Sequence, residues 1–278
     1  MSHLTLGYLT LDSAPQDTVT AAAEAGFKSV GIRITGRRIA DPYTKVIGNP
    51  SMIREIRRRV DDSGIHLSNI SAYHFYPDVQ WSDLQGVLDT TAELGAKIVV
   101  SNSYIADENQ FLDLFTRYAE AAQKHGIRLA IEFMKYSEAK SIEQSARLVE
   151  KSGQPNAGFL IDPLHLDRSA GTADKIKKID PKRIVFVQLC DAMKRPGDVP
   201  NSELMKEART ARLPPGKGNL PLYDFLDALP AGTEVEYEVP MPEHAGLPLT
   251  ERAKIAFDTF QAYMREYTQK RGHKLGSL

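Results

Sequence analysis

Four segments with the pattern of buried strands each carry a polar, oxygen-bearing side chain near the end where the strand stops. In 127–133, for example, Ile131 and Phe133 share one face and Glu132 lies on the other, because side chains alternate along a strand. The four side chains are those of Glu132, Asp162, Gln188 and Glu238. Carboxylates gathered inside a protein repel one another and lose hydration, so this pattern calls for a cation.

A divalent metal ion would supply that cation. An all-oxygen ligand set of Glu132, Asp162, Gln188 and Glu238 favours a hard ion, so we expect Mg²⁺ or Mn²⁺, with Zn²⁺ and Co²⁺ as alternatives. His165, three residues after Asp162, would add a nitrogen ligand or bind substrate. A single strand-end glutamate more often pairs with Arg or Lys than with a metal, but the four residues together favour a metal. Glu236, two residues before Glu238, is expected deeper in the protein with a structural role.

The elements that position these residues follow one repeated pattern. A helical segment ends near a glycine and a β-branched or apolar run follows, as where 21–26 leads into 27–33. This pattern and similar apolar runs predict strands at 4–11, 27–33, 65–70, 96–100, 127–133, 157–162, 184–189 and 234–239. Strands that alternate with helices at this spacing imply a parallel sheet. We therefore predict the α/β class, with residues 1–278 forming one (β/α)₈ TIM barrel and residues from about 270 onward forming a tail.

The composition and the residues at the turns exclude other classes of protein. The open, doubly wound alternative would need a glycine-rich turn after the first strand, and the turn reads Thr10 to Pro15 without one. Lys and Arg number 35 against 36 Asp and Glu, which argues against a nucleic-acid-binding surface. No apolar run approaches the ~20 residues of a membrane span. The first residues lack the pattern of a signal peptide, and a single cysteine, Cys190, excludes an internal disulfide, so we expect a cytoplasmic protein.

The strand-end motifs, taken in order, resemble a known superfamily. They are Ile131-Glu132, Asp162-Pro163-Leu164-His165, Gln188-Leu189-Cys190-Asp191, Arg212-Leu213-Pro214-Pro215-Gly216-Lys217-Gly218 and Tyr237-Glu238-Val239-Pro240. Their order and spacing resemble the xylose-isomerase-like sugar isomerase and epimerase superfamily, which also holds inosose dehydratases and endonuclease IV. Endonuclease IV resembles this chain in fold only, because its trinuclear zinc cluster needs more His and carboxylate ligands.

The resemblance implies roles for particular residues. It places a metal on Glu132, Asp162 and Glu238, with Gln188 where the superfamily usually has a histidine. It implies that Glu132 and Glu238 act as catalytic bases on opposite faces of the substrate, while His165 and Arg212 bind the substrate. No organic cofactor is implied. The glutamine departs from the superfamily pattern and puts the metal affinity in question.

The expected activity is metal-dependent isomerisation or epimerisation of a sugar or keto-sugar, through proton abstraction next to a carbonyl and an enediolate intermediate. The first alternative is a lyase of the inosose or dehydroshikimate dehydratase kind, because β-elimination shares the same first step. The second is a non-catalytic sugar-binding relative whose metal site has decayed, which the glutamine at position 188 motivates. The expected partner is a small carbohydrate, with no nucleic acid or membrane, and the resemblance also implies a homo-oligomer.

Overall fold

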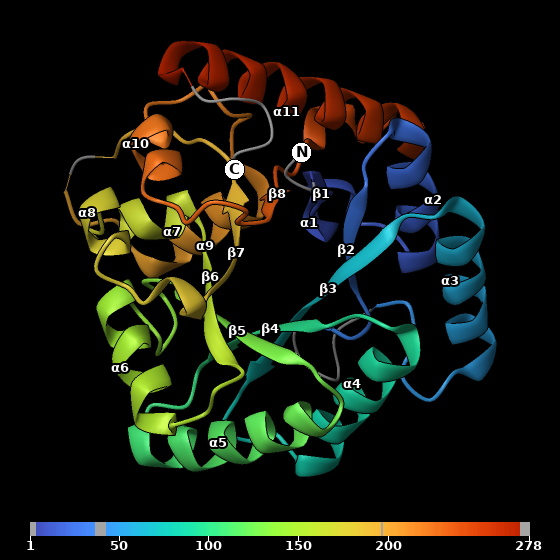
Figure 1. Cartoon of the computed structure of the whole chain (residues 1–278), viewed down its shortest axis with the longest axis vertical. Coiled ribbons are helices and arrows are strands. Elements are labelled where there is room, and N and C mark those ends of the chain that lie inside the picture. The colour runs from blue at the N-terminus through green and yellow to red at the C-terminus, as the bar shows by residue number, and fades with distance from the viewer. Residues whose placement is uncertain (1–3, 37–42, 196, 273–278) are drawn as a thin grey trace.

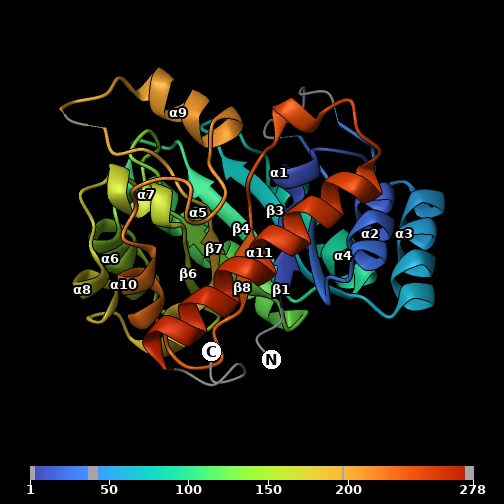
Figure 2. The ribbon, with the colours of Figure 1, turned by 90° about the horizontal axis from the view of Figure 1, so that it is seen from above.

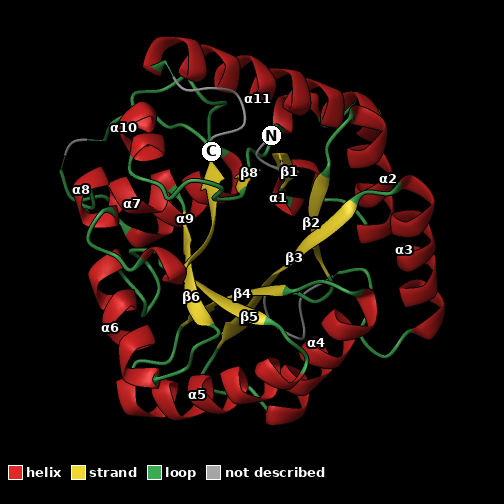
Figure 3. Ribbon diagram, viewed as in Figure 1, coloured by secondary structure: helices red, strands yellow, loops and turns green. Residues whose placement is uncertain are grey.

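Eight parallel strands close into a barrel in the computed structural model, and helices surround it (Figures 1 and 3). The structure describes residues 4–36, 43–195 and 197–272. Each strand pairs with the next one along the chain, and β8 pairs with β1. The predicted (β/α)₈ barrel is therefore confirmed. In the described parts of the chain, no helix is long and apolar enough to cross a membrane.

The strands and helices have the following bounds. The strands are β1 (Leu4–Leu6), β2 (Ser29–Arg33), β3 (His66–Phe75), β4 (Ile98–Ser103), β5 (Arg128–Glu132), β6 (Ala157–Ile161), β7 (Ile184–Leu189) and β8 (Val235–Tyr237). The helices are α1 (Tyr8–Leu11), α2 (Pro15–Ala25), α3 (Pro50–Ser63), α4 (Trp81–Leu94), α5 (Glu108–Lys124), α6 (Ile142–Ser152), α7 (Pro163–Arg168), α8 (Ala173–Ile176), α9 (Asn201–Thr210), α10 (Leu222–Asp227) and α11 (Leu249–Arg271), with short 3₁₀ turns η1 (Pro181–Arg183) and η2 (Pro242–His244).

The first strand is shorter than the sequence predicts. It ends at Leu6, and residues 8–11 form α1 instead of continuing the strand. The backbone of Gly7 passes close to β8, donates to the carbonyl of Tyr237 at 2.8 Å, and leaves no room for a side chain, since a Cβ there would lie 3.0 Å from a Glu236 oxygen. The chain turns at this point, and Tyr8 then lines the barrel mouth.

The other differences concern the ends of elements. Strand β3 runs from the segment predicted at 65–70 on to Phe75. Strand β8 stops at Tyr237, so Glu238 lies just beyond it. Helix α11 continues to Arg271, and most of the predicted tail, residues 273–278, lies outside the described part of the chain.

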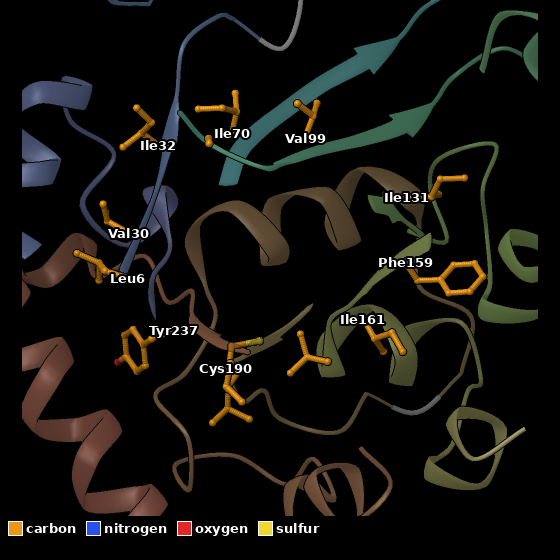
Figure 4. Packing of buried hydrophobic residues seen from close by; sticks show 14 of the residues in the cluster. Leu6, Val30, Ile32, Ile70, Val99, Ile131, Phe159, Ile161, Cys190 and Tyr237 are labelled. Atoms are coloured by element: carbon orange, nitrogen blue, oxygen red, sulfur yellow. The ribbon is translucent and has the colours of Figure 1, made fainter. Parts of the chain in front are cut away.

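Most of the hydrophobic core lies between the barrel and its helices. Outward-facing strand residues such as Val30, Val99 and Phe159 are almost fully buried there (Figure 4). Inside the barrel, the half formed by β4 to β7 holds a second, smaller apolar cluster. Its members are Val100, Ala130, Leu160 and Phe186.

The other half of the barrel interior is polar. Asn69 on β3 and Glu236 on β8 are fully buried, and Gln188 on β7 is 2% exposed. The register pairs Gln188 with Glu236 and Gly31 with Asn69, so these side chains point toward the barrel axis at similar depth. Gly31 makes their contact across the barrel sterically feasible, because a Cβ there would lie 2.7 Å from Asn69 and 2.8 Å from Glu236.

Replacing Gly31 with alanine is expected to destabilise the fold. The added methyl group would overlap Asn69 and Glu236, and overpacking of this kind costs about 1–3 kcal/mol. Gly246→Ala is the control, because nothing lies within 4 Å of a Cβ built there. Urea denaturation should show the loss for Gly31→Ala alone; equal stabilities of the two variants would contradict the packing described.

Candidate active site

A cavity opens at the C-terminal ends of the strands. Helix α9 lies above this end of the barrel, while the last turns of α11 lie toward the other end (Figure 2). This is the end at which (β/α)₈ enzymes place their active sites, because the loops that follow the strands meet there. Glu132, His165, Gln188, Arg212 and Glu238 all line the cavity.

The four strand-end residues converge as the strand directions require. Glu132 is the last residue of β5, Asp162 directly follows β6, Gln188 is the fifth residue of β7, and Glu238 follows β8. All four are buried, and Glu132 is the most exposed of them at 8%. Sequence reasoning placed each at a strand end, and parallel pairing brings those ends together.

Glu132 and His165, which line the cavity, form a close group with the buried Asp162. One potential ligand atom of each lies within 4.8 Å of the others. The Nε2 atom of His165 lies 3.6 Å from Oε1 of Glu132, and it has no hydrogen-bond partner among the described residues although it is buried. Asp162 caps α7, accepting from the backbone N–H groups of Leu164 at 2.7 Å and His165 at 3.3 Å. This cap fixes His165 on the first turn of that helix, facing the cavity.

Arg212 supplies a positive charge to the same group. Its side chain is 2% exposed, and the guanidinium forms an ion pair with Asp162 and reaches Oε2 of Glu238 at 3.2 Å. Among the described residues, Arg212 forms no such ion pair with Glu132. The sequence placed Arg212 over the substrate; the structure places it between two of the carboxylates expected to bind the metal.

Asp191 shapes the loop that carries Arg212. It pairs with Leu213 in an isolated antiparallel bridge, and its carboxylate accepts from the backbone N–H groups of Gly216 at 3.0 Å and Gly218 at 2.9 Å. A Cβ at Gly218 would lie 2.4 Å from the Asp191 carboxylate, so only glycine fits there. The contacts of Asp191 with this loop therefore help to position the guanidinium group of Arg212.

Helix α9 is fastened over the cavity by a buried ion pair that sequence reasoning missed. Arg168 on α7 donates two hydrogen bonds to Glu207 on α9, at 2.9 and 2.8 Å. Arg212 in turn donates from Nε to the carbonyl of Ala208 at 2.7 Å. Arg168 and Glu207 are 39 residues apart, so no local sequence pattern indicates their pairing.

The far wall of the cavity is aromatic and was also not predicted in full. It includes Tyr8, His74, Tyr104 and Tyr136, and the rings of His74 and Tyr104 meet edge to face at 5.8 Å. Arg209 also lines the cavity, and no ion pair links it to the described residues. Tyr8 was missed because its segment was assigned to a strand. A wall of this kind suits a small molecule with both apolar faces and oxygen substituents.

The pKa values of Glu132 and Asp162 are shifted in opposite directions. Burial, together with the charges of Glu238 and Asp162, raises the pKa of Glu132 to about 8. Burial would also raise the pKa of Asp162, but Arg212 and His165 outweigh it and the pKa falls below its ordinary value. Burial lowers the pKa of His165 to about 4, so its ring is neutral at neutral pH. Neutral imidazole is the form that can accept a hydrogen bond or bind a metal.

The donor set fits a divalent cation. Glu132 and Asp162 offer carboxylate oxygens, His165 offers a buried nitrogen, and Oε1 of Gln188 is a buried acceptor without a donor among the described residues. Buried polar atoms rarely lack partners, so their convergence indicates a missing cation or ligand. The group is thus a candidate metal site.

Comparison with known proteins identifies relatives of this chain. The model of the family described as "xylose isomerase-like TIM barrel" matches residues 19–246. The chain is 25% identical over 231 residues, 78% of its length, to a 3-dehydroshikimate dehydratase of Pseudomonas putida, and the match spans only 34% of that longer protein. It is 23% identical over 198 residues to an inosose isomerase of Bacillus licheniformis, covering 66% of this chain and 69% of the isomerase.

A solved structure supports the fold. The crystal structure of the IOLI protein with a bound zinc atom superposes with a TM-score of 0.77 at 18% identity, covering 97% of this chain and 99% of that one. At this identity the likeness concerns the fold.

The raised pKa of Glu132 predicts how stability depends on pH in the metal-free protein. Between pH 4.5 and about 8 the folded state keeps a proton on Glu132 that the unfolded state releases, so stability falls as pH rises. Glu132→Gln removes this penalty, and the variant should exceed wild type in stability by on the order of 3 kcal/mol at pH 8, with little difference at pH 4.5. Urea denaturation with EDTA at both pH values measures this. A constant difference would show that Glu132 keeps an ordinary pKa.

Proposed function

The chain belongs to the xylose isomerase-like TIM-barrel family, and from that premise we propose that it is a divalent-metal-dependent isomerase or epimerase of a sugar or keto-sugar. The curated relatives that it matches are enzymes, an isomerase and a dehydratase. The observation that carries the proposal is the convergence of Glu132, Asp162 and His165 at the barrel mouth, where Glu132 and His165 line the cavity. Such a site is built to handle protons and charge on a small substrate.

The proposed ligands of the metal are Glu132, Asp162, Gln188 and Glu238, with His165 close enough to bind metal or substrate. The zinc-bound IOLI structure has the same fold, which supports a divalent ion here. When bound, such an ion polarises a carbonyl group and stabilises negative charge on its oxygen. Arg212 remains beside Asp162 and Glu238 and limits the repulsion among the carboxylates.

Glu132 is the proposed base. It lines the cavity, and no described arginine forms an ion pair with it. A bound divalent ion would favour its ionised form, which can take a proton from the carbon next to the substrate carbonyl. Glu238 enters from β8, across the barrel from β5 (Figure 1), and would return a proton to the other side of the substrate. His165 and Arg212 would hold the substrate oxygens by hydrogen bonds.

A dehydratase is the second candidate, and the unequal surroundings of the two glutamates favour it. Arg212 reaches Glu238 at 3.2 Å and so disfavours Glu238 as a second proton donor, whereas Glu132 retains His165 at 3.6 Å. A single residue suffices for β-elimination if it takes the proton and then delivers it to the hydroxyl group that leaves from the carbon beyond the enolate, which departs as water. The match to a dehydratase over 78% of the chain supports this alternative.

Proton abstraction by Glu132 can be tested with two probes, an inosose and 3-dehydroshikimate, in deuterated water with Mn²⁺. We expect wild type to incorporate deuterium into a probe or its product, and Glu132→Gln to lose at least about 100-fold of that rate. Glu120→Gln, an exposed glutamate on α5, is the matched control. Retained exchange in Glu132→Gln would remove Glu132 from the role of base. Recovery of an isomer identifies the isomerase, and growth of ultraviolet absorption from an unsaturated product identifies the dehydratase.

Metal binding can be tested without any substrate. Mn²⁺ added to EDTA-treated wild type should raise the melting temperature, because a ligand that binds only the folded state stabilises it by about 2.7 kcal/mol at 100 times its dissociation constant. The shift should be much smaller in Asp162→Asn. An unchanged melting temperature in wild type would favour the non-catalytic, sugar-binding alternative.

A further inference from the structure

A buried polar network reaches the cavity through Gln188 and Ser71, and its members other than Gln188 have no role in the function proposed above. Its members are Gln188 on β7, Glu236 on β8, and Asn69 and Ser71 on β3. Glu236 and Asn69 are fully buried, and Gln188 and Ser71 are each 2% exposed. Burying a carboxyl group at this depth is costly unless hydrogen bonds compensate, so the contacts of Glu236 need an explanation.

Both oxygens of Glu236 accept a hydrogen bond from an amide. Its Oε2 accepts from Nδ2 of Asn69 at 2.6 Å, and its Oε1 accepts from Nε2 of Gln188 at 2.9 Å. The Asn69 amide is oriented in turn, because its Oδ1 accepts from the hydroxyl of Ser71 at 3.1 Å. In both hydrogen bonds the amide donates from its nitrogen, so the amide oxygens of Asn69 and Gln188 are not engaged by Glu236.

This arrangement determines which atom of Gln188 is available to the cavity. Its nitrogen is engaged by Glu236, and Gln188 lines the cavity. Its Oε1 is buried and has no donor among the residues that the structure describes. A buried oxygen without a hydrogen-bond donor is unfavourable unless it binds a cation or accepts a hydrogen bond from a ligand.

We propose that Glu236 is a positioning residue that, with Asn69, holds the Gln188 amide so that its oxygen faces the cavity as a ligand for the divalent ion. The inference rests on the metal dependence of the proposed function. It assigns a role to a carboxyl group that the sequence indicates only as structural. Outer partners that orient a metal ligand typically contribute about 10- to 100-fold to metal affinity.

The shape of the barrel interior supports the assignment. Gly31 and Gly7 leave space for Glu236 that any side chain would fill, with Cβ positions 2.8 and 3.0 Å from its oxygens. Glu236 thereby reaches Asn69 on β3 from β8, although β1 and β2 separate the two strands in the barrel.

Glu236→Gln tests the orientation with little change in shape. If Oε1 of the new side chain accepts from Asn69, its nitrogen faces Gln188, and the Gln188 amide must rotate to present its oxygen to that nitrogen. The cavity then receives an N–H group in place of an oxygen, while every hydrogen bond of the network is kept. We expect Mn²⁺ affinity, measured by calorimetry, to fall at least tenfold, with the melting temperature of the metal-free protein changed by only a few degrees.

The exchanged pair, Gln188→Glu with Glu236→Gln, is the rescue. The side chain at 236 can then accept from Asn69 and donate to the carboxylate at 188, which presents an oxygen to the cavity again. Mn²⁺ affinity should return to wild type or exceed it. Glu234→Gln is the matched control, because Glu234 lies two residues earlier on the same chain face and bonds to Thr5 rather than to Gln188.

Side-chain amide signals in nuclear magnetic resonance separate this inference from the metal hypothesis. In wild type the Gln188 NH₂ protons should be protected from exchange with solvent, and in Glu236→Gln they should become exposed. Unprotected protons in wild type, unchanged Mn²⁺ affinity in Glu236→Gln, or failure of the exchanged pair to restore affinity would each overturn the proposal. Protected protons in a wild-type protein that binds no Mn²⁺ would support the orientation and contradict the proposed metal dependence.

Discussion

Four carboxyl groups are buried around one guanidinium at the mouth of this barrel. Glu132, Asp162, Glu236 and Glu238 are each 8% exposed or less, and Arg212 forms ion pairs with two of them. Charges of one sign at this depth are tolerated only when cations or hydrogen bonds offset their lost hydration. Each carboxyl group is stabilised in a different way. Asp162 and Glu238 form ion pairs with Arg212, and Glu236 accepts hydrogen bonds from two side-chain amides. Glu132 has a raised pKa and lies near the neutral His165.

Much of the surrounding structure serves this balance of charge. Asp191 organises the loop that brings Arg212 to the centre, and the Arg168–Glu207 pair holds α9 above it. The glycines at 7 and 31 give the buried network its space. The apolar half of the barrel interior, from β4 to β7, provides a rigid wall of low polarity on the other side. In such surroundings electrostatic interactions are stronger than in water, which suits a site that must stabilise charge on a substrate.

The fold could be predicted because its signals are local and repeated. Helices such as α2 and α6 end at glycines with positive φ, Gly26 and Gly153, and buried strands follow each of them. The strand-end position of Glu132 and Asp162 follows from the alternation of side chains, and their convergence follows from parallel pairing. The turn at Gly7 escaped prediction because it depends on the packing of Glu236 against that backbone, a contact 229 residues away in sequence.

The partners of the charged groups could not be predicted, since they depend on contacts between distant segments. Nothing near Arg212 in the sequence indicates that it pairs with Asp162, 50 residues earlier. Asn69 lies in a segment that alternates apolar and polar residues, and nothing near it in the sequence indicates its contact with Glu236. The sequence therefore indicates where charge accumulates, whereas the structure shows which charges are already neutralised and which are not.

The central claim is that a divalent ion neutralises the negative charge that remains on the buried carboxyl groups at the barrel mouth. Anomalous diffraction at the manganese absorption edge, from crystals grown with Mn²⁺, tests it most directly. The account predicts one strong peak within ligand distance of Glu132 and Asp162, with the Gln188 oxygen turned toward it. Crystals grown at a saturating Mn²⁺ concentration that show no peak there, with Arg212 still paired to both Asp162 and Glu238, would contradict it.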